Sequence, residues 1–218
     1  MKRRTLPAAA ALTAAAALLL TACGGGGDNS KANDKIAGAD TGNTKTSAAP
    51  STSAPSKANR PKISFPSYAK NVFEDQKTGD TTKDAVLADS AMSVNSMDDA
   101  IFKGSTDAEA LGFYNSGKAL SSAITFVQGY IDKNDTWIGE TRYFDRKVTL
   151  SGDGQAYVTY CSDESKSFLK NKRTGKVDKT PTSADSYVLY HTSLSKNPQG
   201  VWQTTDIVSN RGDKACQP

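Results

Sequence analysis

Hydrophobic residues follow two different periods along this chain. In the middle of the chain Leu120, Ile124, Val127 and Ile131 recur every three to four residues, the spacing that aligns side chains on one face of a helix. Beyond about residue 140 the spacing shortens to two, and β-branched and aromatic residues become frequent. The pattern therefore predicts helices first and strands afterwards.

Two helix starts precede the strands. Residues 81–84 (Thr-Thr-Lys-Asp) resemble a capping box and are followed by apolar residues that share one helix face. These apolar residues are Leu87, Ala91, Val94 and Ile101. Residues 106–109 (Thr-Asp-Ala-Glu) predict a second helix, which carries the stripe from Leu120 to Ile131 and ends near residues 133–135.

Four segments with the composition of strands form two pairs. The segments are residues 141–151, 155–163, 184–194 and 201–209. Residues 152–154 (Gly-Asp-Gly) join the first pair and residues 197–200 (Asn-Pro-Gln-Gly) the second, and both combinations favour turns. The polar residues 170–176 are expected at a hairpin tip. Helices followed by an antiparallel meander predict an α+β fold with N-terminal helices packed on one face of the sheet.

Residues 24–64 contain small, polar and charged residues, with Ile36 and Ile63 as the only large aliphatic ones. Such a stretch buries too little apolar surface to offset the entropy of ordering, so we expect a disordered tether. Aromatic residues begin at Phe65 and Tyr68. The folded domain is therefore expected to span residues 65–218.

The N-terminus has the features of an export signal. Lys2, Arg3 and Arg4 precede a run of apolar and small residues over 6–20. This run is short for a membrane span, which needs roughly 20 predominantly apolar residues, and much of it is alanine. A secretory signal fits the pattern better than an uncleaved membrane anchor.

Leu20-Thr21-Ala22-Cys23 closes this run and resembles the lipobox of bacterial lipoproteins. The resemblance implies that a signal peptide, residues 1–22, is removed and that the thiol of Cys23 receives a diacylglycerol, with acyl chains such as palmitate. Residues 23–64 would then form a lipid-anchored tether that holds the domain at the outer, extracytoplasmic face of the cell membrane. An ordinary secretory signal and an uncleaved anchor are the alternatives.

Charge and cysteine content narrow the classes of partner. Three of the 27 Lys and Arg residues lie in the signal, which leaves 24 against 23 Asp and Glu. A nearly neutral chain lacks the basic face that a nucleic-acid binder needs, so no nucleic-acid partner is expected. Besides Cys23, only Cys161 and Cys216 remain, an even pair that predicts a disulfide in an exported chain. Two free thiols are the alternative, and no His/Cys cluster favours a metal.

Candidate catalytic residues are few. No phosphate loop, zinc motif, Rossmann fingerprint or nucleophile elbow is present, so no cofactor and no metal are predicted. His191, the only histidine, lies in a predicted strand and is expected to face solvent. Asp145 and Asp206 could act as a base if they were buried in an apolar pocket, because burial raises the pKa of a carboxyl group. Exposed or ion-paired aspartates are the more ordinary interpretation.

A longer resemblance spans residues 66–218. It depends on the placement of aromatic residues, cysteines and turns, namely Tyr114, Gly129-Tyr130-Ile131-Asp132, Trp137, Arg142-Tyr143-Phe144, Val158-Thr159-Tyr160-Cys161, Thr174-Gly175-Lys176, Trp202-Gln203 and Cys216. This order is similar to that of secreted actinobacterial lipoproteins with a domain like nuclear transport factor 2 (NTF2-like). The resemblance implies a cone, in which a curved antiparallel sheet wraps around the helices and leaves a pocket at the open end.

The candidate pocket residues are six aromatic residues and one carboxylate: Tyr114, Trp137, Tyr143, Tyr160, Tyr190, Trp202 and Asp206. The aromatic side chains could hold a ring-shaped or acyl ligand, or could equally be ordinary core packing. The expected function is a non-catalytic binding or accessory module of the cell envelope, whose partner is another envelope protein or an apolar small molecule. The alternatives are an isomerase-like or cyclase-like enzyme with a pocket carboxylate, and an interaction surface on the open sheet face.

Overall fold

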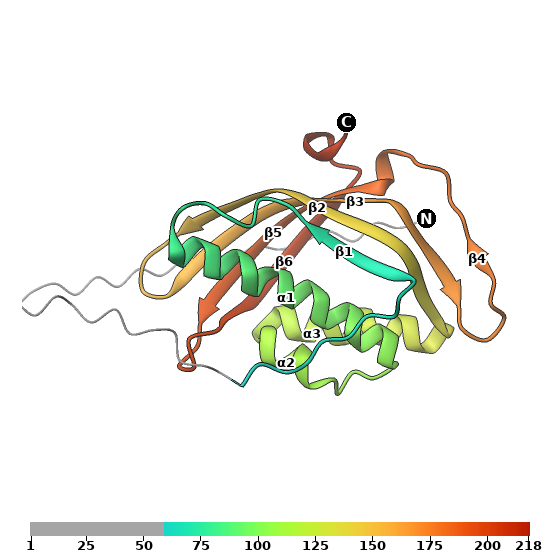
Figure 1. The fold of residues 1–218 in the computed structure, drawn as a ribbon, viewed down its shortest axis with the longest axis horizontal. Helices are drawn as coiled ribbons and strands as arrows, with labels where there is room; N and C mark the ends of the chain where they lie inside the picture. Colours follow the sequence, from blue (N-terminus) through green and yellow to red (C-terminus); the bar gives the residue numbers. More distant parts are fainter. Residues whose placement is uncertain (1–58) are drawn as a thin grey trace, which may run out of the picture. The chain divides into compact units, whose positions relative to one another are not determined.

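A curved sheet of mixed strand direction arches over three helices in the computed structural model, which describes residues 59–218 (Figure 1). The strands are β1 (Ala69–Phe73), β2 (Asp135–Leu150), β3 (Gln155–Asn171), β4 (Val177–Asp178), β5 (Tyr187–Lys196) and β6 (Trp202–Arg211). The helices are α1 (Thr81–Lys103), α2 (Glu109–Tyr114) and α3 (Gly117–Lys133). The predicted signal peptide, Cys23 and most of the predicted tether lie outside the described residues.

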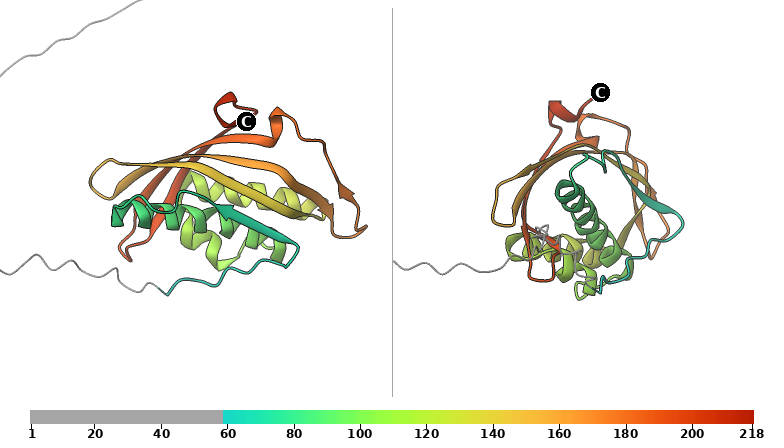
Figure 2. Two further views of the ribbon diagram at one scale, coloured as in Figure 1. Left: turned by 45° about the horizontal axis from the view of Figure 1, so that its top comes forward. Right: turned by 60° about the vertical axis from the view of Figure 1, so that its left-hand side comes forward.

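The predicted α+β fold class, with N-terminal helices packed on a curved sheet, is confirmed, except that one strand pair is parallel. The strand order is β1-β2-β3-β5-β6, and β4 pairs with β3. All pairs are antiparallel except β1 with β2. The sequence pattern predicts neither β1 nor β4, because both are short and lack an apolar alternation. Figure 2 shows α1 lying inside the arch of the sheet.

The curvature of the sheet originates in β2. Its pairing with β3 shifts register between Glu140 and Arg142 and again between Phe144 and Lys147. Just before the first shift, Gly139 has a φ of 100°, and a Cβ there would lie 2.0 Å from the carbonyl oxygen of Lys166. Register shifts of this kind bend a strand and increase its twist. The sheet can therefore wrap around the helices instead of lying flat on them.

Helix α1 begins at a cap one residue earlier than the predicted capping box. The side chain of Asp80 accepts hydrogen bonds from the backbone N–H groups of Thr82 and Lys83. Asp84, expected to close the box, instead accepts from the backbone and side chain of Thr78. Gly104, in the left-handed conformation, ends the helix.

The helix predicted to start at residues 106–109 is interrupted, so that prediction is wrong for its middle part. Asn115 is extended and separates α2 from α3. Its buried amide donates to Ser96 Oγ at 3.0 Å and accepts from Ser93 Oγ at 2.7 Å, so the side chain ties the break to α1. Helix α3 then begins at Gly117, which has a φ of 55°.

The core divides along α1. One cluster contains Leu87, Val158 and Trp202, and a second contains Ile101 and Val127. A single helix thus touches both ends of the cone. Among residues 59–218, no helix is long and apolar enough to cross a lipid bilayer.

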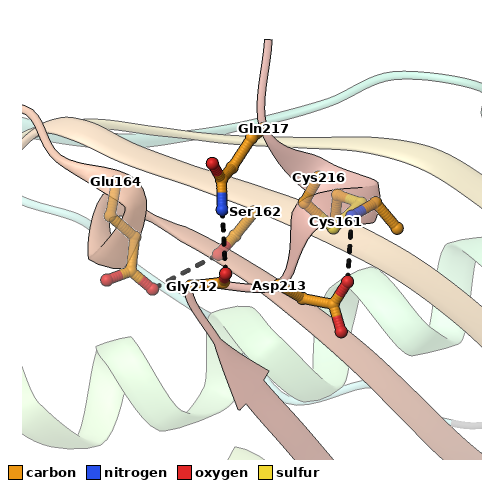
Figure 3. The surroundings of a disulfide bond; sticks show 8 residues. Cys161, Ser162, Glu164, Gly212, Asp213, Cys216 and Gln217 are labelled. Carbon is orange, nitrogen blue, oxygen red and sulfur yellow. Dashed lines mark hydrogen bonds between the residues drawn. A yellow bond between two sulfur atoms is a disulfide. The ribbon is translucent and has the colours of Figure 1, made fainter.

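Both ends of the described chain are fastened to this body. Before the domain boundary expected at Phe65, Arg60 pairs with the buried Asp89 and the backbone N–H of Ser64 donates to Asp99. At the other end, the predicted disulfide between Cys161 and Cys216 is present and holds the C-terminal turn against β3 (Figure 3).

Candidate functional site

A cavity of about 770 Å³, partly open to solvent, lies between α1, α3 and the inner face of the sheet. Its floor includes Val94 and Met97 of α1 and Ala123 of α3. Seven aromatic side chains also line it: Phe126, Tyr130, Trp137, Tyr143, Tyr160, Phe168 and Tyr190. The volume falls in the range of roughly 300–1,000 Å³ typical of small-molecule sites.

The aromatic walls are packed against one another and against the core. Tyr160 stacks on Tyr190 with ring centroids 4.9 Å apart and meets Tyr143 edge-on at 6.0 Å. Tyr143 in turn stacks on Phe73 of β1 at 4.7 Å. Rings held on both sides lose little freedom when a ligand arrives, so the wall is preorganised.

Asp98 of α1 places a carboxylate in this aromatic wall. Its Oδ1 accepts a hydrogen bond from Trp137 Nε1 at 2.9 Å, and its Oδ2 accepts from Asn71 Nδ2 at 2.7 Å. These donors come from β2 and β1, so the sheet orients the carboxylate from behind. Each oxygen keeps a further lone pair for another partner.

Burial raises the pKa of Asp98 to about 7, and the negative charge of Glu164 adds to the rise, while the two hydrogen bonds oppose it. Burial likewise raises the pKa of Tyr130 to about 12 and those of Tyr143, Tyr160 and Tyr190 above their usual range. The tyrosines therefore stay neutral near pH 7. Asp98 is poised to gain or lose a proton there.

The mouth of the cavity is polar. Arg211 at the end of β6 donates to Glu164 Oε2 at 2.8 Å and to the carbonyl oxygen of Asp185 at 2.7 Å. Ser162, beside the disulfide, donates to Glu164 Oε1 at 3.3 Å (Figure 3). These contacts join β3, β6 and the segment before β5 at the rim, close to the covalent link at Cys161.

Four of the seven predicted pocket residues line the cavity: Trp137, Tyr143, Tyr160 and Tyr190. The other three do not, and the prediction is corrected for them. Tyr114 is buried at the end of α2 against Val201, and Trp202 is buried in the core cluster that also contains Leu87 and Val158. Asp206 lies on β6 with a half-exposed side chain and an ion pair to Lys118 at 3.8 Å.

The remaining candidates also lie outside the cavity. Asp145 is exposed at the second register shift of β2, with a φ of 50°. His191 is exposed, as expected, and its Nδ1 lies 3.4 Å from Thr159 Oγ1. Within residues 59–218, no group of three or more His, Cys, Asp or Glu side chains could hold a metal ion.

Asp98 was not among the predicted residues, although the sequence carries a signal for it. It follows Val94 by four residues and precedes Ile101 by three, so it lies on the predicted apolar face of α1. A charged residue on such a face needs an explanation, because a buried carboxylate is costly.

The outer sheet face shows scattered apolar residues. Tyr157 of β3 and Val208 of β6 are about half exposed. On β5 between them, Ser193 pairs with Tyr157 and His191 pairs with Val208. Isolated apolar residues of this kind are ordinary on protein surfaces. The interaction surface considered from the sequence thus gains no support here.

No protein-family model matches this chain, and no curated protein matches it. Among solved structures, a ketosteroid isomerase-like protein from Erwinia carotovora atroseptica is similar, with 14% identity and a TM-score of 0.36 over 58% of this chain and 95% of that one. A domain of unknown function with a cystatin-like fold from Nostoc punctiforme has 19% identity and a TM-score of 0.36, over 62% of this chain and 79% of that one. The intermembrane space region of the chloroplast protein ARC6 has 11% identity and a TM-score of 0.35, over 62% of this chain and 98% of that one. These values are too low to indicate what this chain does.

Proposed function

We propose that this chain is a binding protein of the cell envelope, which is anchored by an acylated Cys23 and holds an apolar small molecule in its cone. The observation that carries the binding role is the open cavity of about 770 Å³. A cone built only for support would be filled by its own side chains, since protein interiors are normally close-packed. The address depends on the lipobox-like segment 20–23.

A pair of neighbouring serines on α3 offers a matched test of binding. Ser122 lines the cavity and Ser121 does not, while both are exposed and should tolerate a larger side chain. Ser122→Phe should narrow the cavity and weaken binding of neopentylbenzene, a neutral apolar probe, at least about tenfold, whereas Ser121→Phe should leave it unchanged. Isothermal calorimetry on the full chain measures both. Equal affinity of the two variants would contradict the proposed site.

The anchor is tested separately. Cys23→Ala removes the thiol that receives the lipid, so the protein should move from the membrane fraction to the soluble exported fraction. Its binding of neopentylbenzene should not change. Membrane retention of the Cys23→Ala protein would refute lipid anchoring and leave the binding site untouched.

One observation favours a second candidate function, general acid–base catalysis. A partly buried carboxyl group with a pKa of about 7 beside aromatic side chains can accept or return a proton at neutral pH. If Asp98 acts in this way, the protein should accelerate deuterium exchange at the carbon beside the carbonyl of 2-tetralone in D₂O. Asp98→Asn should abolish that acceleration. If 2-tetralone exchanges no faster with the protein than in buffer, catalysis by Asp98 is excluded and its role is binding.

A further inference from the structure

The charges that face the cavity are unbalanced. Among residues 59–218, four carboxylates line it, those of Asp98, Glu164, Asp178 and Asp185, against the single guanidinium of Arg211. Arg211 is already engaged, because it donates to Glu164 and to a backbone carbonyl. Asp178 and Asp185 are exposed, so water screens them, but Asp98 lies deeper. The part of the chain that the structure describes therefore gives the cavity an excess of negative charge and no free cation.

Asp98 is partly buried at the cavity wall, and its hydrogen-bond donors carry no charge. Within residues 59–218 no lysine, arginine or histidine forms an ion pair with it; its two donors are the uncharged amide of Asn71 and indole of Trp137. Asp89 and Asp99, on the same helix, are each paired with a cation. An unpaired buried charge is unfavourable, and a ligand cation would remove that cost.

The aromatic wall suits the same kind of ligand. The faces of tyrosine and tryptophan rings carry partial negative charge and attract organic cations within about 6 Å. Trp137, Tyr130 and Tyr143 line the cavity together with Asp98. A carboxylate and several rings around one space can hold an ammonium group, while the apolar floor holds the rest of the molecule.

We propose that the ligand is an organic cation, an amine or quaternary ammonium with an apolar ring or chain, whose nitrogen lies beside Asp98. This inference rests on the proposed binding function and specifies the chemical class of its ligand.

The titratable groups that face Asp98 come from α3 and from four strands. They are Tyr130 on α3, Tyr143 on β2, Glu164 on β3, Tyr190 on β5 and Arg211 on β6. The pKa values of the three tyrosines are raised, and Glu164 and Arg211 are paired with each other. Since burial raises the pKa of Asp98 to about 7, a cation should bind more tightly as Asp98 ionises. The gain between pH 6 and pH 8 should be about tenfold.

Three probes of similar shape separate charge from apolar contact: benzyltrimethylammonium, its neutral carbon analogue neopentylbenzene, and the anion benzylsulfonate. Calorimetry on the full wild-type chain at pH 8 should give the tightest binding for the cation and the weakest for the anion. Asp98→Asn should weaken binding of the cation about tenfold or more. It should change the affinity for the neutral probe by no more than about twofold. Asp206→Asn, which removes a carboxylate outside the cavity, should change neither.

The possible results separate this inference from the proposed function. Neutral or anionic probes that bind as tightly as the cation would overturn the inference while the binding cavity stands. Failure of all three probes would overturn both. A cation whose affinity is the same at pH 6 and pH 8, or the same in Asp98→Asn, would place its nitrogen away from Asp98 and also overturn the inference.

Discussion

Helix α1 presents aspartates to two regions of the molecule, and the two regions balance charge differently. Toward the scaffold, Asp89 is paired with Arg60 and Asp99 with Lys103. Toward the cavity, Asp98 receives neutral donors only. The scaffold aspartates also bind backbone N–H groups, that of Trp202 to Asp89 and that of Ser64 to Asp99.

This difference separates structural from functional charge. A carboxylate that is paired and hydrogen-bonded fixes segments far apart in the chain, and breaking it leaves buried groups unsatisfied. A carboxylate held only by neutral donors at a cavity wall keeps its charge available. Removing a paired scaffold carboxylate should therefore lower the free energy of unfolding. Removing the cavity carboxylate should weaken ligand binding.

The largest effect on the scaffold is expected from the disulfide. It closes a loop with a sequence separation of 55 residues. In the loop-entropy treatment, replacing both Cys161 and Cys216 with alanine should lower the free energy of unfolding by about 4 kcal/mol. Urea denaturation of the oxidised protein and of the variant measures the change. A loss below about 1 kcal/mol would mean that the C-terminal turn is not a support of the scaffold.

Next comes the buried scaffold aspartate. Asp89→Ala leaves Arg60 without its partner and the buried N–H of Trp202 without an acceptor, which should cost about 2–3 kcal/mol. Lys118→Ala serves as the control, because it breaks only the exposed ion pair with Asp206 and should cost less than about 0.5 kcal/mol. Similar losses in both variants would remove the distinction between buried and exposed pairs.

The smallest effect has the opposite sign. From about pH 4 to pH 7 the unfolded chain has released the proton of Asp98 while the folded protein retains it, so Asp98 lowers stability as the pH rises. Asp98→Asn should therefore gain about 1–3 kcal/mol over the wild type at pH 8, and the gain should shrink toward pH 4. The unpartnered Oδ1 of Asn71 can accept from the new amide after rotation.

Asp99→Asn is the matched control for that experiment. Its carboxylate contacts Lys103 and the N–H of Ser64, so the substitution should lower stability at pH 8. Denaturant unfolding at pH 4, 6 and 8 compares the two variants. A loss of stability at pH 8 in Asp98→Asn equal to that in Asp99→Asn would make Asp98 another scaffold residue.

The sequence predicted those parts of the fold that local patterns encode. The turns at residues 152–154 and 197–200 join the strands as expected, because glycine, asparagine and aspartate favour them. Strand β1 was missed because its short sequence, Ala-Lys-Asn-Val-Phe, acquires its place only by pairing with β2. The break at Asn115 was missed because hydrogen bonds to α1, distant in the chain, stabilise it.

The candidate site was predicted only in part. Aromatic residues on alternating positions of β2, β3 and β5 were found, but which of them face the cavity depends on how far the helices fill the cone. Trp202 is enclosed in the core, whereas Tyr190 borders the cavity. Asp98 could have been noticed on the apolar face of α1. Its lack of a cationic partner is a property of the tertiary structure.

The most direct test of the central claim is the titration of the Asp98 side-chain carboxyl carbon by ¹³C NMR in the unliganded protein. A cavity carboxylate without a cationic partner predicts a pKa of about 7 for Asp98. A pKa for Asp98 at or below the ordinary value for an aspartate, about 3.9, would contradict it, since the carboxylate would then be solvated or paired with a cation.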